Sequence, residues 1–88
     1  MAAIRKLVLD VLKPHQPNAL EFAAALADQG PDYRVRLTVT EMDEKTESTI
    51  IVITGRDIEF EAIEEAIKRM GASLHSIDEV EVYGPSPA

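Results

Sequence analysis

The amino-acid sequence predicts an α+β protein in which one antiparallel sheet is covered by two helices. Four stretches carry the two-residue apolar period or the continuous apolar run that is typical of strands. Two other stretches carry apolar residues three and four positions apart, as amphipathic helices do. A glycine follows each helical stretch, Gly30 after the first and Gly71 after the second. The 88 residues therefore divide into two similar halves, each with a strand, a helix and a second strand.

The first half opens with a strand at residues 4–12, where Leu7, Leu9 and Val11 alternate with other side chains. Lys13-Pro14 is expected to end this strand, because proline lacks the N–H that a ladder needs. A helix is predicted over residues 18–29. Its apolar face is predicted to consist of Leu20, Ala23, Ala24, Leu26 and Ala27, with Phe22 at the flank.

A hairpin is predicted to join the two halves. Residues 33–40 alternate apolar and polar side chains, and residues 46–54 form a second strand after the polar turn at residues 43–45. The second strand holds four consecutive apolar residues at 50–53. Because both of its faces are apolar there, this strand is expected to lie in the interior of the sheet.

The second half continues with a helix and a last strand at residues 73–83. The glutamates of this helix are expected to form a solvated face, because Glu64 and Glu65 each lie four residues before a basic side chain. The buried face of the helix is marked by Ile58, Phe60, Ile63, Ile67 and Met70.

The element order is that of the ferredoxin-like βαββαβ sandwich. Right-handed crossovers then give a four-stranded antiparallel sheet in the order 4-1-3-2, with two helices on one face and the other face open. Residues 1–84 are expected to form this single domain, and residues 85–88 a flexible C-terminal tail.

Composition excludes several classes of function. Sixteen acidic and nine basic residues give a net charge of −7, which disfavours binding to the phosphate backbone of nucleic acids. The absence of cysteine excludes disulfide scaffolds and thiolate metal sites. The N-terminal stretch resembles neither a signal peptide nor a membrane span, so a cytoplasmic protein is expected. A domain of this size buries little surface, and a homo-oligomer is expected for that reason.

One polar cluster is predicted where the first strand meets the last. If Asp10 pairs with His75, the same register places Lys6 opposite Glu79 on the open sheet face. Strict alternation would then bury Asp78 without a partner, at a high cost in free energy. A β-bulge near residues 76–78 that turns Asp78 outward is therefore predicted.

Two interpretations of this cluster remain open. The first is structural: Asp10, His75 and Glu79 make hydrogen bonds across strands or between subunits and protect an exposed edge. The second is a binding site, with Asp10 and Asp78 as ligands of a divalent metal ion and with His75 and Glu79 binding a small polar ligand. Carboxylates prefer hard cations, so Ca²⁺ or Mg²⁺ is expected as the cofactor.

No catalytic residues are predicted. Neither a serine nor a cysteine nucleophile is organised around His75, and His15 lies in a proline-bounded loop where a surface position is expected. The chain is therefore expected not to be an enzyme.

Two terminal motifs stand out, residues 7–15 (LVLDVLKPH) and 74–80 (LHSIDEV), together with Glu41-Met42-Asp43 and Thr46-Glu47 at the hairpin. With these motifs the chain resembles the archaeal family called domain of unknown function 211. The resemblance implies a ferredoxin-like fold and ring-like homo-oligomers, in a family without an established biochemical activity.

The sequence thus favours a small oligomeric binding or regulatory module that pairs with itself through the open sheet face or the strand edges, without nucleic acid or membrane partners. A purely structural assembly protein is the alternative, and an enzyme of unknown class is the third.

Overall fold

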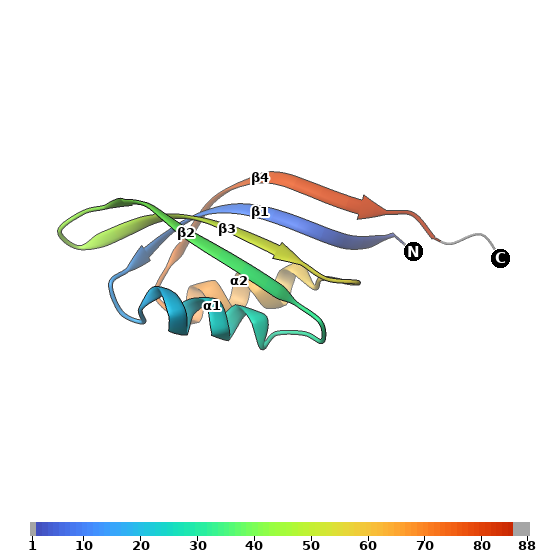
Figure 1. The fold of residues 1–88 in the computed structure, drawn as a ribbon, viewed down its shortest axis with the longest axis horizontal. Coiled ribbons are helices and arrows are strands. Elements are labelled where there is room, and N and C mark those ends of the chain that lie inside the picture. Colours follow the sequence, from blue (N-terminus) through green and yellow to red (C-terminus); the bar gives the residue numbers. More distant parts are fainter. Residues whose placement is uncertain (1, 86–88) are drawn as a thin grey trace.

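The computed structural model describes residues 2–85 and confirms the predicted fold. Four antiparallel strands form one sheet in the order β2-β3-β1-β4, which is the predicted order read from the opposite edge. Both helices lie on one side of the sheet (Figure 1). The elements are β1 (Ala3–Pro14), α1 (Ala19–Ala27), β2 (Arg34–Met42), β3 (Thr46–Thr54), α2 (Phe60–Arg69) and β4 (Ser73–Tyr83).

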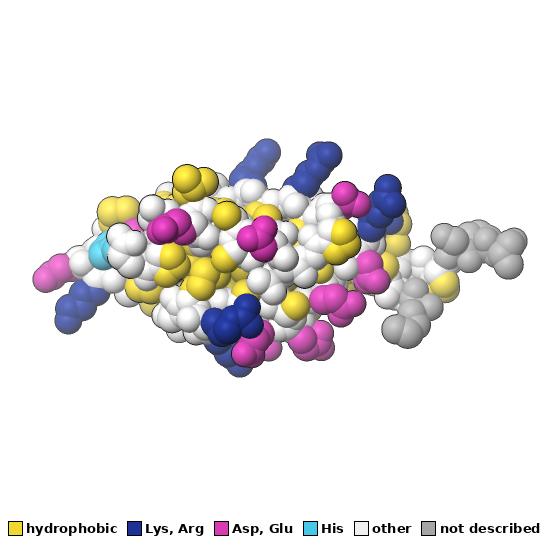
Figure 2. All heavy atoms as spheres, turned by 90° about the horizontal axis from the view of Figure 1, so that it is seen from below, with side chains coloured by type: hydrophobic (Ala, Val, Ile, Leu, Met, Phe, Trp, Pro, Cys, Tyr) yellow, Lys and Arg dark blue, Asp and Glu magenta, His cyan; other side chains and the backbone are white. Residues whose placement is uncertain are grey.

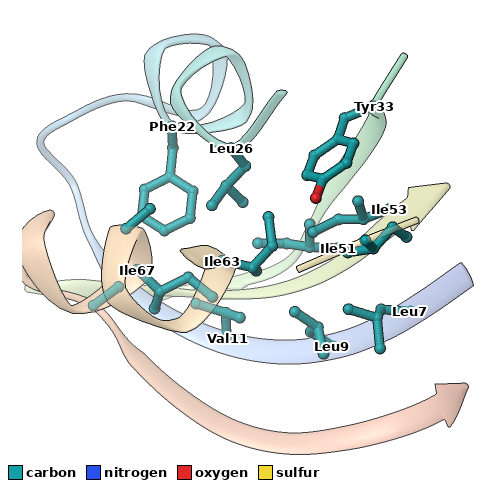
Figure 3. Packing of buried hydrophobic residues seen from close by; sticks show 13 residues of the cluster. Leu7, Leu9, Val11, Phe22, Leu26, Tyr33, Ile51, Ile53, Ile63 and Ile67 are labelled. Carbon is teal, nitrogen blue, oxygen red and sulfur yellow. The ribbon is translucent and has the colours of Figure 1, made fainter. Parts of the chain in front are cut away.

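The core lies between the sheet and the helices. Leu7, Leu9 and Val11 of β1 point into it, as their two-residue period predicted, together with Ile51 and Ile53 of the interior strand β3. Figure 3 shows these side chains meeting residues from both helices and Tyr33, which lies just before β2. Large apolar side chains from four elements and from Tyr33, just before β2, thus form one continuous cluster: Leu7, Leu9, Val11, Phe22, Leu26, Tyr33, Ile51, Ile53, Ile63 and Ile67.

Helix α1 begins as its sequence predicted but presents a different face to the core. The Oδ1 atom of Asn18 accepts the backbone N–H of Glu21 at 2.8 Å, and the Glu21 carboxylate accepts the N–H of Asn18 at 3.1 Å, a complete capping box. The predicted face was right for Leu26, which is fully buried, but wrong for Leu20, which is 79% exposed, and for Phe22, which was placed at the flank and is fully buried. Side chains two residues apart point about 200° apart around the helix axis, so Leu20 and Phe22 cannot both face the core.

Strand β1 extends beyond the predicted end. Lys13 pairs with Glu47, and Pro14 pairs with Thr46 as the last residue of the strand. A proline is tolerated at such a terminal position of a strand, where one missing N–H interrupts no continuing ladder. The consequence is that Lys13 joins the inward-facing series of β1 and is fully buried.

The outer surface of the helical layer is polar. Figure 2 shows acidic and basic side chains scattered over this side, with hydrophobic side chains between them. Glu61 and Glu65 of α2 are exposed, as the solvated face predicted. Neither helix in the described part of the chain has the length and apolar character needed to cross a membrane. The predicted flexible tail at 85–88 lies, from residue 86 onward, outside the described residues.

Candidate functional site

Asp10 and His75 lie near one another, but not in the predicted pairing. Asp10 is opposite Ser76, and the ladder between β1 and β4 shifts register at the next pair, passing over His75. The predicted direct pairing was therefore wrong. The two side chains nonetheless line one cavity of about 480 Å³ on the open sheet face, with Leu12, Thr40, Ser48 and Ser73.

Asp78 occupies the predicted bulge. The register shifts between Val8, which faces Glu79, and Leu9, which faces Ile77, so Asp78 has no partner in β1. Its side chain is exposed, and its Oδ1 atom accepts a hydrogen bond of 2.7 Å from the Ser76 hydroxyl. The bulge thus avoids burying a carboxylate, as predicted from the sequence.

Glu79 is held by an ion pair. Its carboxylate lies 2.8 Å from the ammonium of Lys6, although Glu79 stands opposite Val8 and Lys6 stands opposite Glu81. The contact is therefore diagonal across the two strands. The hydrogen bond that the Lys6 ammonium donates to Glu79 raises the pKa of Lys6 above its ordinary value. The Glu79 carboxylate, which was predicted to bind a ligand, is therefore already paired with Lys6.

The four predicted site residues consequently fall into separate contacts. Within residues 2–85, no group of three histidine, aspartate or glutamate side chains is arranged to hold a metal ion. Asp10 and His75 share a cavity, whereas Asp78 and Glu79 are engaged with Ser76 and Lys6. Binding of a cation or small polar ligand at these residues stays a prediction.

A second polar cluster, formed by Lys13, Glu47 and His15, was missed by the sequence reasoning. The Lys13 ammonium, completely buried, donates to Glu47 Oε1 at 3.1 Å and to the Pro14 carbonyl at 2.8 Å. The other Glu47 oxygen accepts from His15 Nδ1 at 2.8 Å, and His15 Nε2 lies 3.0 Å from the Glu44 carbonyl. These contacts tie the turn of the β2–β3 hairpin to the link between β1 and α1.

The geometry favours a protonated His15. Both ring nitrogens face oxygen acceptors, and a neutral imidazole has only one N–H to offer. The hydrogen bond to Glu47, followed by that to the Glu44 carbonyl, raises the pKa of His15 above 6.5. In return, the hydrogen bonds from His15 and Lys13 lower the pKa of Glu47 below 4.5. A buried carboxylate therefore stays charged between two cations.

The sequence does contain a signal for this cluster. Position 13 continues the buried two-residue series of Leu7, Leu9 and Val11. Glu47 likewise continues the series of β3 that contains the buried Thr49. When two antiparallel strands pair, an inward-facing lysine opposite an inward-facing glutamate indicates a buried ion pair. The pairing of Lys13 with Glu47 was not predicted, because Pro14 led to the expectation that the strand ends before it.

This cluster is suited to holding the hairpin turn against the link between β1 and α1 in a manner that depends on pH. The Lys13 ammonium is inaccessible to solvent, and both nitrogens of His15 already have partners. Loss of the His15 proton removes one of the two hydrogen bonds and loosens the tie to the hairpin turn.

The stability of the protein is expected to fall as pH rises from about 6 to 8. A raised folded-state pKa means that the His15 contribution is complete below about pH 6.5 and is lost as pH rises through the higher folded value. The lowered pKa of Glu47 acts at acidic pH, with its contribution lost as pH falls through the folded value. Melting temperatures measured across this range by circular dichroism test the expectation.

Histidine variants provide the control for this pH dependence. His15→Gln is expected to flatten the fall between pH 6 and 8. His75→Gln removes the second of the two histidines and is expected to leave the fall unchanged. A His15→Gln variant that keeps the wild-type slope would contradict the assignment.

Comparison with known proteins identifies a family and a relative of this chain. Residues 5–86 match the DUF211 family, which is described as uncharacterized ArCR. The chain is also similar to the uncharacterized protein MJ0319 of the archaeon Methanocaldococcus jannaschii. The two are 41% identical over 80 residues, which cover 91% of this chain and 82% of the relative.

Proposed function

We propose that this chain, which belongs to the DUF211 family described as uncharacterized, is a small binding module that acts as a homo-oligomer. The proposal rests on the two edge strands of the sheet. In this proposal the outer strand β4 of one subunit pairs with the outer strand β2 of the next. Such pairing extends the sheet and leaves its open face accessible, including the cavity at Asp10 and His75.

The observation that carries the proposal is an uncovered apolar strip on β4. Ile77, Val80 and Val82 are 49%, 53% and 50% exposed. Val80 stands opposite the buried Leu7, so it lies on the core side of the sheet. Figure 1 shows the C-terminal part of β4 extending past both helices. A long exposed edge strand with apolar side chains favours association with another strand.

The two sheet edges carry opposite charge. Strand β4 contains Asp78, Glu79 and Glu81, whereas β2 carries the exposed Arg34 and Arg36 and a single acidic residue, Glu41. Pairing two β4 edges would bring like charges together, and pairing β4 with β2 brings opposite charges together. Electrostatics therefore favours contact between unlike edges. Repetition of such a contact closes into a ring or continues as a filament.

Val80→Glu is expected to dissociate the oligomer into monomers. The substitution places a charge in the apolar strip at a half-exposed position, so the monomer itself should still fold. Molar mass measured by light scattering after size-exclusion chromatography reports the change. Leu20→Glu adds the same charge at an exposed position of α1 and should leave the mass unchanged. Wild-type protein that elutes as a monomer would contradict the proposal.

A mixing experiment distinguishes unlike from like edges. Arg36→Glu reverses a charge on β2 and is also expected to dissociate the oligomer, because β2 then repels β4. An equimolar mixture of Arg36→Glu and Val80→Glu retains one intact β2 edge and one intact β4 edge. The mixture is therefore expected to form a heterodimer. Two-fold pairing of β4 edges would instead leave Arg36→Glu assembled by itself.

A further inference from the structure

A concentration of basic side chains lies at the end of the sheet opposite the hairpin turn. The strand register places Arg34 opposite Thr54, Thr54 opposite Lys6 and Lys6 opposite Glu81. The four strands thus contribute one side chain each to a single row on the open face. This row lines a cavity of about 640 Å³ together with residues of the adjoining loops.

Arg5 is fixed at the wall of this cavity. The ladder of β1 and β4 shifts register between Ile4 and Lys6, so Arg5 is the extra residue of a β-bulge. Its Nε–H donates to the Gly55 carbonyl at 3.1 Å, and its guanidinium carbon lies 4.3 Å from the centre of the Tyr83 ring. Stacking and one hydrogen bond therefore orient a guanidinium that has five N–H donors in total.

The cavity is positively charged although the protein is strongly acidic. Asp32 and Glu81 are the two carboxylates among its lining residues. They face four of the nine basic residues of a chain whose net charge is −7. The four basic residues are Arg5, Lys6, Arg34 and Arg56.

The existing ion pairs neutralise this charge only partly. Lys6 is paired with Glu79 at 2.8 Å, whereas Arg56 lies 3.9 Å from Asp32, with both of the latter side chains mostly exposed. Within residues 2–85, Arg34 makes no ion pair and no side-chain hydrogen bond. Basic side chains that surround a concave space and lack strong partners provide donors for an external anion.

We propose that this cavity binds a small phosphorylated molecule through Arg34, Arg56 and Arg5. Guanidinium groups match the geometry of phosphate oxygens and donate paired hydrogen bonds to them. The volume lies within the range of about 300 to 1,000 Å³ that small-molecule sites occupy. A long nucleic acid is disfavoured, because the acidic surface beyond the cavity would repel its phosphates.

Pyrophosphate titrated into the full chain at low salt, and followed by isothermal calorimetry, tests the proposal. Saturable binding is expected, and Arg34→Gln or Arg56→Gln should each weaken it about tenfold, the loss of one charge-assisted interaction. Arg69→Gln removes the same charge from the exposed end of α2 and should change the affinity little. Arg56 lies outside the strands, so its variant tests the anion site separately from assembly through strand edges.

Removal of a carboxylate gives a test in the opposite direction. Asp32→Asn should tighten pyrophosphate binding about threefold, because it removes a like charge from the cavity. Asp32 has a φ of 61°, a conformation that asparagine also tolerates, so the backbone should be preserved. Asp28→Asn makes the same change at the exposed end of α1 and should have little effect.

Three results would overturn the proposal. The first is no saturable binding of pyrophosphate at millimolar concentration. The second is an equal loss of affinity in Arg69→Gln and Arg56→Gln, which would indicate general charge attraction. The third is tighter binding of a single-stranded oligonucleotide than of pyrophosphate, with the same dependence on Arg34 and Arg56, which would assign the cavity to a nucleic acid.

Discussion

Replacing Glu47 with alanine is expected to lower the free energy of unfolding by about 3 to 5 kcal/mol, the cost of leaving a buried charge without its partner. The Lys13 ammonium is completely buried, and the Glu47 carboxylate is its counter-ion at 3.1 Å. His15 loses the same carboxylate. Urea denaturation at a fixed protein concentration measures the change.

Two variants test whether this loss comes from the unpaired charge. The double variant Lys13→Met with Glu47→Leu replaces the pair by apolar side chains of similar size and should recover most of the lost stability. Glu79→Ala breaks the exposed pair with Lys6 and should cost far less than Glu47→Ala. Equal losses in Glu47→Ala and Glu79→Ala would contradict the assigned role of Lys13.

Phe22→Ala is expected to destabilise the protein by about 3 to 5 kcal/mol, as truncation of a buried aromatic ring does. Phe22 is fully buried and projects from α1 into the layer between the helices and the sheet (Figure 3). Its removal leaves a cavity beside Leu26 and the residues of α2. The same urea denaturation measures the loss.

Leu20→Ala is the matched control for the orientation of α1. Leu20 is 79% exposed, and its truncation should change stability by no more than about 0.5 kcal/mol. If Leu20→Ala destabilised the protein as much as Phe22→Ala, the helix would present the face predicted from sequence.

The pairing of β4 with β1 could be predicted only in part from the two-residue period of the sequence. The bulge at Asp78 was predictable, because regular alternation would have buried a carboxylate at a high cost. The register shift at His75 could not be predicted in this way. A histidine can face either side of an exposed edge strand without a comparable cost in free energy. The pairing of Asp10 was therefore predicted one residue away from its position.

The orientation of α1 was unpredictable for a different reason. Its many alanines fit either a buried or an exposed position, so the apolar pattern has no single strong direction. Packing against α2 and the sheet selects the face with Phe22 and Leu26, which fills more volume than the face with Leu20.

The sequence by itself determined the element order, the sheet order, the interior place of β3 and the need for a bulge near Asp78. Each follows from local periods, turn residues or the cost of a buried charge, which act over a few residues. Only the tertiary structure decided that Lys13 meets Glu47 and His15, and that Arg5, Arg34 and Arg56 surround one cavity. These groups are far apart in the chain, and the strand register, set by backbone hydrogen bonds and packing of the whole sheet, brings them together.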